Sequence, residues 1–292
     1  FTKTAWWLMV TVDPTEKSWL QVANPHINDI RIYEQEMGQG NWREVYQSGD
    51  YYPYEQRILD DPDFWFPVEP ATKTYLMRID KQGESLNIPL RLVRESSLAP
   101  YLSDRTFFNG VFLGWIFLLL ILNAFLWVSL KDHIHLFYIL YVGFSMMWII
   151  SQWGIGFRYF WPEWTSFTSK SRPVFSNIAY IFMLELTARF FTIPNTQPLY
   201  TRTIRVIQFL LLASSIFLLY ADIPTSTALS RYIFLTSMNI IWIAALVLII
   251  LFIWKSYKKQ KELSLFFLAA LGFFSFYVFL LLLSQYKIGG DW

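Results

Sequence analysis

The chain has 292 residues, 54% of them hydrophobic, which exceeds the roughly 45–50% of ordinary soluble domains, so we expect much of it to lie in lipid. Its net charge of +2 argues against the strongly basic surface that nucleic acid requires of a partner. It has no cysteine, which excludes disulfides, zinc–thiolate sites and thiol nucleophiles.

The first part of the chain, residues 1–98, alternates apolar and polar side chains in short segments separated by Pro, Gly, Asn and Asp. These segments are "SWLQVAN", "NDIRIYEQ", "FWFPVE", "TKTYLMRID" and "IPLRLVRE". In "DIRIYE", Ile30 and Ile32 face one way while Arg31 and Tyr33 face the other, as in a half-buried antiparallel strand. The pattern predicts an all-β sandwich.

A run of apolar residues follows a short linker, residues 99–106. At about 1.5 Å per helical residue, the segment 107–130 is long enough to cross a hydrocarbon core of roughly 30 Å. Five more apolar segments bounded by polar residues follow it. We expect six membrane helices, at 107–130, 134–153, 173–191, 203–220, 232–254 and 263–284, and an external loop at 285–292. Pro173 is expected in the first turn of its helix.

The distribution of basic residues predicts the orientation in the membrane. If residues 1–98 lie outside, the inner loops carry more Lys and Arg than the outer ones. The inner set is Lys131, Arg189, Arg202, Arg205, Lys255, Lys258, Lys259 and Lys261, and the outer set is Arg158, Lys170, Arg172, Arg231 and Lys287. The bias favours an external β-domain and a cytoplasmic "KSYKKQKE" loop.

Several stretches of the membrane part carry a resemblance to a known family. They are "NGVFLGWIFLLLILNAFLWVSLKDHIHLFYILYVGF", with Gly110, Gly114, Asn123 and the turn Lys131–Asp132, then "GIGFRYFWPE", then "LELTARFFTIPNTQPLYTRTIR". They are similar to the helical part of the bacterial seven-transmembrane receptors with diverse intracellular signalling modules. The similarity covers most of 107–284.

The N-terminal part resembles the type 2 extracellular domain of the same family, a jelly-roll-like sandwich. The stretches concerned are "SWLQVANPHINDIRIYEQ", "GDYYPYEQRILDDPDFWFPVEP" and "YLMRIDKQGESLNIPLRLV", and Arg57 stands at the family's recurring arginine. The resemblance implies a multi-pass protein of the bacterial inner membrane with a periplasmic sensor domain and no cofactor.

Compared with the family, we expect the chain to be truncated at both ends. The signal peptide and the start of the sensor domain would precede Phe1, and a seventh helix and a cytoplasmic output module would follow Trp292. Output modules of the family include diguanylate cyclases and histidine kinases. The fragment itself shows no nucleophile–base grouping or phosphate-binding loop and is not expected to be an enzyme.

Aromatic side chains near the predicted loops are candidates for ligand contact, because ring faces beside polar groups suit stacking against sugars. The candidate set is Trp42, Tyr51, Tyr52, Tyr54, Trp65 and, as a hydrogen-bonding partner, Arg57. A carbohydrate or related small molecule is the ligand hypothesis. The alternative, which we favour for each single ring, is that it fills the core of the sandwich.

Two groups of residues raise the question of a metal. The turn "DDPD" carries Asp60, Asp61 and Asp63, and clustered carboxylates suit calcium, but three acids are too few to specify a site. We favour a solvated turn. His133 and His135 lack clear further ligands and are expected at the membrane interface.

Two further pairs lie within the predicted helices. Glu185 precedes Arg189 by one turn, so the pair is a candidate signalling switch, with structural pairing and snorkelling as the favoured alternative. Gly110 and Gly114 form a small-xxx-small pair that permits close helix packing or a homodimer, and intramolecular packing is the favoured use.

The sequence as a whole favours a sensory receptor that binds an external ligand and transmits the signal through its helices to an output domain. A transporter or membrane-embedded enzyme is the first alternative, but it would need more ionisable groups at membrane depth. A receptor that acts through a separate cytoplasmic partner is the second.

Overall fold

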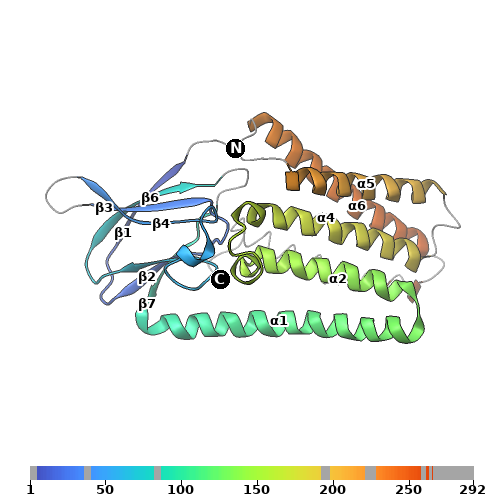
Figure 1. Ribbon diagram of the computed structural model, residues 1–292, viewed down its shortest axis with the longest axis horizontal. Helices are drawn as coiled ribbons and strands as arrows, with labels where there is room; N and C mark the ends of the chain where they lie inside the picture. Colours follow the sequence, from blue (N-terminus) through green and yellow to red (C-terminus); the bar gives the residue numbers. More distant parts are fainter. Residues whose placement is uncertain are drawn as a thin grey trace.

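The computed structural model describes residues 5–35, 41–81, 87–191, 198–220, 228–257, 261–262 and 265. A β-domain lies at one end of the molecule, and long helices extend side by side from it (Figure 1). The all-β domain followed by membrane-type helices confirms the predicted fold class.

The β-domain consists of two antiparallel sheets. Sheet A has the strand order β1-β6-β3-β4, and sheet B has the order β5-β2-β7. The strands are β1 (Trp6–Val12), β2 (Ser18–Val22), β3 (Asp29–Gln35), β4 (Trp42–Ser48), β5 (Phe64–Val68), β6 (Lys73–Asp80) and β7 (Leu90–Arg94), with a short 3-10 helix, η1 (Tyr54–Gln56). The chain changes sheet at nearly every connection, which ties the two sheets into one sandwich.

The inner faces of the two sheets form one apolar core. In β3, Ile30 and Ile32 are fully buried while Arg31 and Tyr33 lie on the opposite face, as the alternation predicts. Phe66 from sheet B packs into the same core. Burial of each such side chain contributes roughly 1.5–3 kcal/mol to stability, so this core fixes the strand register.

The helices are α1 (Glu95–Leu130), α2 (His133–Gln152), the short α3 (Ile155–Tyr159), α4 (Thr165–Phe190), α5 (Pro198–Tyr220) and α6 (Ala228–Tyr257). Three of the described helices, α1, α2 and α5, are long and apolar enough to cross a membrane, and α6 contains a shorter apolar stretch, Asn239–Lys255. The expected helix at 263–284 and the loop at 285–292 lie outside the described residues.

The expected linker at 99–106 is wrong, because α1 begins at Glu95 and continues without a break. The Ser- and Pro-containing stretch reads as a linker, but Leu98, Tyr101 and Leu102 follow helical spacing and pack on the outer face of sheet B. Tertiary packing therefore overrides the local composition, and Pro100 is accommodated early in the helix.

A second boundary also differs from the prediction. Helix α4 begins at Thr165, so Pro173 lies inside the helix rather than in its first turn. Thr168 and Ser171, before the proline, are buried in the described structure, which gives this polar extension a packing surface.

Helices α4, α5 and α6 share a buried core, whereas α1 lies at the edge beside α2 (Figure 1). Many apolar side chains of α1, such as Trp115 and Phe125, are exposed, as lipid-facing residues are in the absence of a bilayer. Among the described residues, a Cβ atom added at Gly110 or Gly114 would meet nothing within 4 Å. The described helices thus do not pack at this glycine pair, and the expected helix at 263–284 lies outside the described residues, so the use of the pair stays a prediction.

Candidate functional site

The candidate site is the joint between the β-domain and the helices, formed by loops 23–28 and 57–63, the first turns of α1, and α3 with its flanking turns. Close approach at the joint depends on Gly154, whose φ of 72° favours glycine. A Cβ atom there would lie 2.8 Å from Cβ of Pro25 and 3.0 Å from Cβ of Pro62. The β-domain thus rests directly on the turn between α2 and α3.

Arg57 holds the loops of the joint together. Its buried guanidinium donates hydrogen bonds to the carbonyl oxygens of Pro25, Asp61 and Pro62. It also lies over three rings, with its Cζ 4.4 Å from the centroid of Phe64, 4.9 Å from that of Tyr54 and 5.6 Å from that of Phe157 in α3. Burial lowers the pKa of Arg57 from its usual value. The residue is a structural anchor rather than an exposed ligand contact.

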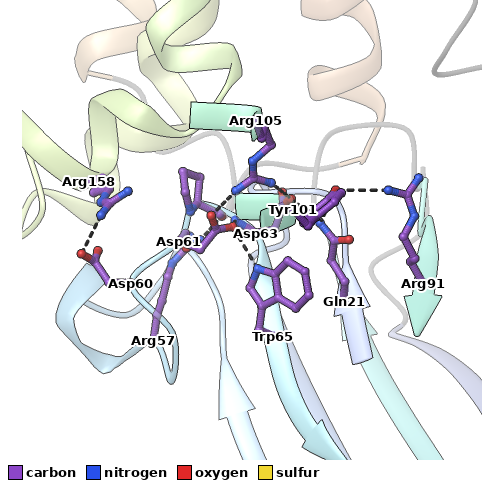
Figure 2. A network of polar contacts seen from close by, with 11 residues as sticks. Gln21, Arg57, Asp60, Asp61, Asp63, Trp65, Arg91, Tyr101, Arg105 and Arg158 are labelled. Carbon is purple, nitrogen blue, oxygen red and sulfur yellow. Dashed lines mark hydrogen bonds and ion pairs between the residues drawn. The ribbon is translucent and has the colours of Figure 1, made fainter. Parts of the chain in front are cut away.

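A network of charged and polar side chains connects α1 to the β-domain (Figure 2). Arg105 of α1 pairs with Asp61 and, at 2.6 Å, with Asp63. Gln21 of sheet B donates to the same oxygen of Asp63 at 2.8 Å, and the indole of Trp65 donates to Asp61 at 2.9 Å. Burial raises the pKa of Asp63, and the positive charge of Arg105 opposes that shift.

A second set of contacts connects α3 to the β-domain. Arg158 donates to Asp60 at 2.6 Å, and the ring of Tyr54 meets that of Phe157 edge to face at 5.6 Å. The backbone N–H of Tyr54 also donates to the carbonyl oxygen of Pro162 at 3.1 Å. Both faces of the joint therefore combine an ion pair with close packing.

His26 is the buried titratable group of the joint. Its Nε2 lies 2.9 Å from the carbonyl oxygen of Gln152 at the end of α2, so the ring is a donor there. Its Nδ1 is buried and has no hydrogen-bond partner among the described residues. Burial, and then the positive charge of Arg172, hold the pKa of His26 well below its usual value.

The structure separates the predicted ligand-binding residues. Tyr54 and Trp65 are buried, in the joint and under α1 respectively, so neither presents a free ring face, and Arg57 lies beneath the same loops. Trp42 and Tyr51 are exposed. The six candidates thus do not form one surface.

The favoured interpretation of Asp60, Asp61 and Asp63 as a solvated turn is wrong for two of the three, because Asp61 and Asp63 are buried and pair with Arg105. Asp60 is exposed and pairs with Arg158, so none of the three carboxylates is free for calcium. Across the part of the chain that the structure describes, no group of three or more His, Asp or Glu side chains is arranged to hold a metal ion. His135 contacts Asn123 through Nδ1 at 3.1 Å, which ties α2 to α1.

The outer face of sheet A is an exposed surface with aromatic and polar groups. Trp7 of β1 lies beside Tyr33 of β3, with ring centroids 5.8 Å apart, and Trp7 is 56% exposed. In the next strands, Arg78 and Arg31 share the carboxylate of Asp29 at 2.7 and 3.0 Å. Tyr52 donates to the same carboxylate at 2.9 Å and accepts from Gln47, and the strand register places Trp42 on this face as well.

A polar cluster lies at the end of the helices away from the β-domain. The carboxylate of Glu185 accepts from Nε of Arg189 at 2.8 Å, as the spacing of four residues predicts. It also accepts from Arg205 of α5 at 3.0 Å, and Gln208 donates to it at 3.4 Å. Arg189 in turn lies 4.4 Å from the ring centroid of Phe137 in α2. The cluster thereby connects three helices.

The residues that sequence reasoning missed are those whose partners are distant in the chain. Arg105 is the last charge before the apolar run of α1, which marks the membrane surface but not its partners Asp61 and Asp63. His26 has no local pattern, because its partner Gln152 is 126 residues away. Trp7 lies on β1, an edge strand of sheet A.

Fold and joint together define a membrane protein whose external β-domain is seated on its helices. Residues 105–289 match the family model described as 7TM diverse intracellular signalling, and residues 1–94 match the one described as 7TMR-DISM extracellular 2. The chain therefore belongs to the 7TMR-DISM family, whose members are transmembrane sensory receptors with an extracellular domain. A comparison with curated proteins found no match.

Proposed function

We propose that the β-domain binds a small external molecule and that the resulting movement of this domain reaches the cytoplasmic end of the helices through α1. The observation that carries the proposal is the continuity of α1. Its first turns pack on sheet B and pair with Asp61 and Asp63, and the same helix of 36 residues continues for about 54 Å. A rigid helix anchored at one end acts as a lever for rigid-body movement.

The ligand that the proposal favours is carbohydrate-like, bound on the outer face of sheet A. Sugars combine apolar ring faces with hydroxyl groups, which match an exposed indole beside charged hydrogen-bonding groups. Trp7 supplies the stacking surface, and Arg31, Arg78 and Asp29 supply donors and acceptors. The proposed site therefore lies on the outer face of sheet A rather than on the predicted loops, and of the predicted residues it includes Trp42 and Tyr52.

The cluster of Glu185, Arg189 and Arg205 is the proposed switch at the cytoplasmic end. A change in the spacing of α4 and α5 would exchange the two arginines around one carboxylate that is only 9% exposed. Such a change alters the surface presented to a diguanylate cyclase or histidine kinase domain, or to a separate partner protein in the alternative arrangement.

Ligand binding is tested by titrating the 292-residue chain with a panel of oligosaccharides, using Trp7→Ala as the variant and Trp164→Ala, an exposed tryptophan remote from sheet A, as the control. We expect binding to weaken about 5- to 160-fold in the first variant only, if the stacked ring contributes about 1–3 kcal/mol, as a base stacked on an aromatic side chain does. Absence of binding by the folded wild type across a broad panel would refute the carbohydrate-like ligand.

Signal transmission is tested in the intact native receptor. Peptide mapping of the native gene product identifies the output domain, and its activity is then measured with and without ligand. If Glu185→Gln leaves ligand-dependent output unchanged, the switch role of the cluster fails. If Arg105→Gln leaves it unchanged, the lever role of α1 fails.

A further inference from the structure

The joint contains a pocket that the proposed ligand site does not use. The pocket has a volume of about 420 Å³ and lies where α1, the turn into α3 and loop 61–63 meet. The lining residues that matter for its chemistry are Asp61, Asp63, Arg105, Gly110, Leu113 and Arg158. It is therefore lined by all three parts of the joint and is open on one side.

The pocket crosses the level at which α1 enters the membrane. Arg105 is the last charged residue of α1 before Lys131, and the apolar run begins directly after it. From Arg105 to Leu113 the helix rises about 12 Å, so the pocket extends that far from the charged surface into apolar surroundings. Exposed Tyr159 and Trp164 nearby are the residue types found at the membrane interface. An occupant must therefore be an amphiphile.

The polar end of the pocket presents guanidinium groups. Arg105 and Arg158 have side chains that are 28% and 22% exposed, whereas the Asp61 and Asp63 carboxylates beneath Arg105 are only 6% and 11% exposed. The partner of Arg158, Asp60, is 73% exposed, and such an exposed ion pair is readily exchanged for another anion. Nε of Arg158 is buried and has no hydrogen-bond partner in the described part of the chain. This end therefore suits a phosphate.

The apolar end is open because α1 has a glycine there. An added Cβ at Gly110 meets none of the described residues within 4 Å, so the wall there is a shallow groove in the helix surface beside Leu113. The rings of Phe112 and Trp153, with centroids 5.6 Å apart, join α1 to the end of α2 next to this groove. A groove of this kind accommodates an acyl chain.

We propose that the pocket binds one acidic phospholipid, with its phosphate at Arg105 and Arg158 and one acyl chain along Gly110 and Leu113. The lipid then lies against both arginines that connect the β-domain to the helices. The bound lipid thereby forms part of the joint, so the lipid composition of the outer leaflet affects how the β-domain is held on the helices. This inference does not depend on the ligand proposed for sheet A.

The test uses native mass spectrometry of the 292-residue chain released from nanodiscs that contain equal amounts of phosphatidylglycerol and phosphatidylcholine. We expect the wild type to retain one phosphatidylglycerol about tenfold more often than phosphatidylcholine, since charge-assisted hydrogen bonds to phosphate provide the difference. Gly110→Leu fills the groove and should abolish this preference. Arg158→Gln should likewise bring the retention of the two lipids close to equal, because it removes a charge-assisted hydrogen bond to the phosphate.

Gly114→Leu is the matched control, because its added side chain also meets open space but Gly114 does not line the pocket. It should retain the preference of the wild type. Equal retention of the two lipids by the wild type, or equal loss in Gly110→Leu and Gly114→Leu, would overturn the proposal. If Gly110→Leu does not fold, an unchanged preference in Arg158→Gln overturns it instead.

Discussion

We expect acidification to open the joint by protonating His26. In the closed joint the ring is neutral, because Nε2 donates to the carbonyl oxygen of Gln152 and the buried Nδ1 has no acceptor among the described residues for a second hydrogen. Among the described residues, the charged groups that contribute most to the shift are cationic, namely Arg172, Lys81 and Arg57. A proton on His26 therefore adds a buried positive charge beside three others.

The direction and size of the effect follow from linkage. The pKa of His26 lies well below 6.5 in the closed joint and returns to about 6.5 when the ring reaches water. Above that pH neither state binds the proton, and the joint keeps its full stability. Below it only the open state binds the proton, so the closed state loses about 1.4 kcal/mol per further pH unit. From about pH 7.5 to about pH 5.5 the equilibrium shifts about tenfold toward the open joint.

The assay is hydrogen exchange of the peptide that covers residues 153–159, corrected for the intrinsic pH dependence of exchange. His26→Gln is the control, since an amide can still donate but does not titrate. The rest of the joint is the same in both proteins, so the difference between them isolates His26. A wild type without extra exchange at the lower pH, or a variant with the same tenfold increase, would refute the reasoning.

Three substitutions test the other contacts. Arg105→Gln leaves two buried carboxylates without their cation and should destabilise the packing of α1 by about 2 kcal/mol. Hydrogen exchange of residues 98–106 should then be about 30-fold faster. The control Arg91→Gln removes a single exposed hydrogen bond and should change this exchange rate less than threefold. Gly154→Ala should reduce the free energy of unfolding by about 1–3 kcal/mol and so lower the melting temperature, because the added Cβ contacts the β-domain and the φ is positive. Gly143→Ala, whose Cβ meets none of the described residues within 4 Å, should leave the melting temperature unchanged. Glu185→Gln should cost about 1–3 kcal/mol in the same melting assay, because it weakens two charge-assisted hydrogen bonds.

The parts of the fold that follow local rules were predictable from the sequence. Strand β3 shows its buried and exposed faces in the alternation of Ile30 and Arg31, and the ion pair of Glu185 and Arg189 follows from helical spacing. The start of α1 was not predictable, because sheet B provides the surface that makes residues 95–106 helical. Local composition does not contain that surface.

The candidate site illustrates the same limit more strongly. The resemblance drew attention to Arg57, but an arginine on an aromatic-rich loop reads equally as a ligand contact or a buried anchor, and only its three carbonyl acceptors decide the matter. The acidic turn likewise fits a cation or a partner arginine. Arg105 lies 42 and 44 residues away from the two carboxylates it contacts, so no local pattern connects them.

The geometry of the sandwich determines how a ligand can act on the helices. The outer face of sheet A and the contact with α1 lie on opposite sides of a core that includes fully buried Ile30 and Met77. Close-packed cores resist small internal shifts, so a ligand bound at the proposed site at Trp7 would act by moving the β-domain as one body. Such movement must act on the contacts of Arg105, Arg158 and His26, because these fix the domain to the helices. The proposed effects of ligand, acid and lipid composition would therefore all act on the same contacts of the joint.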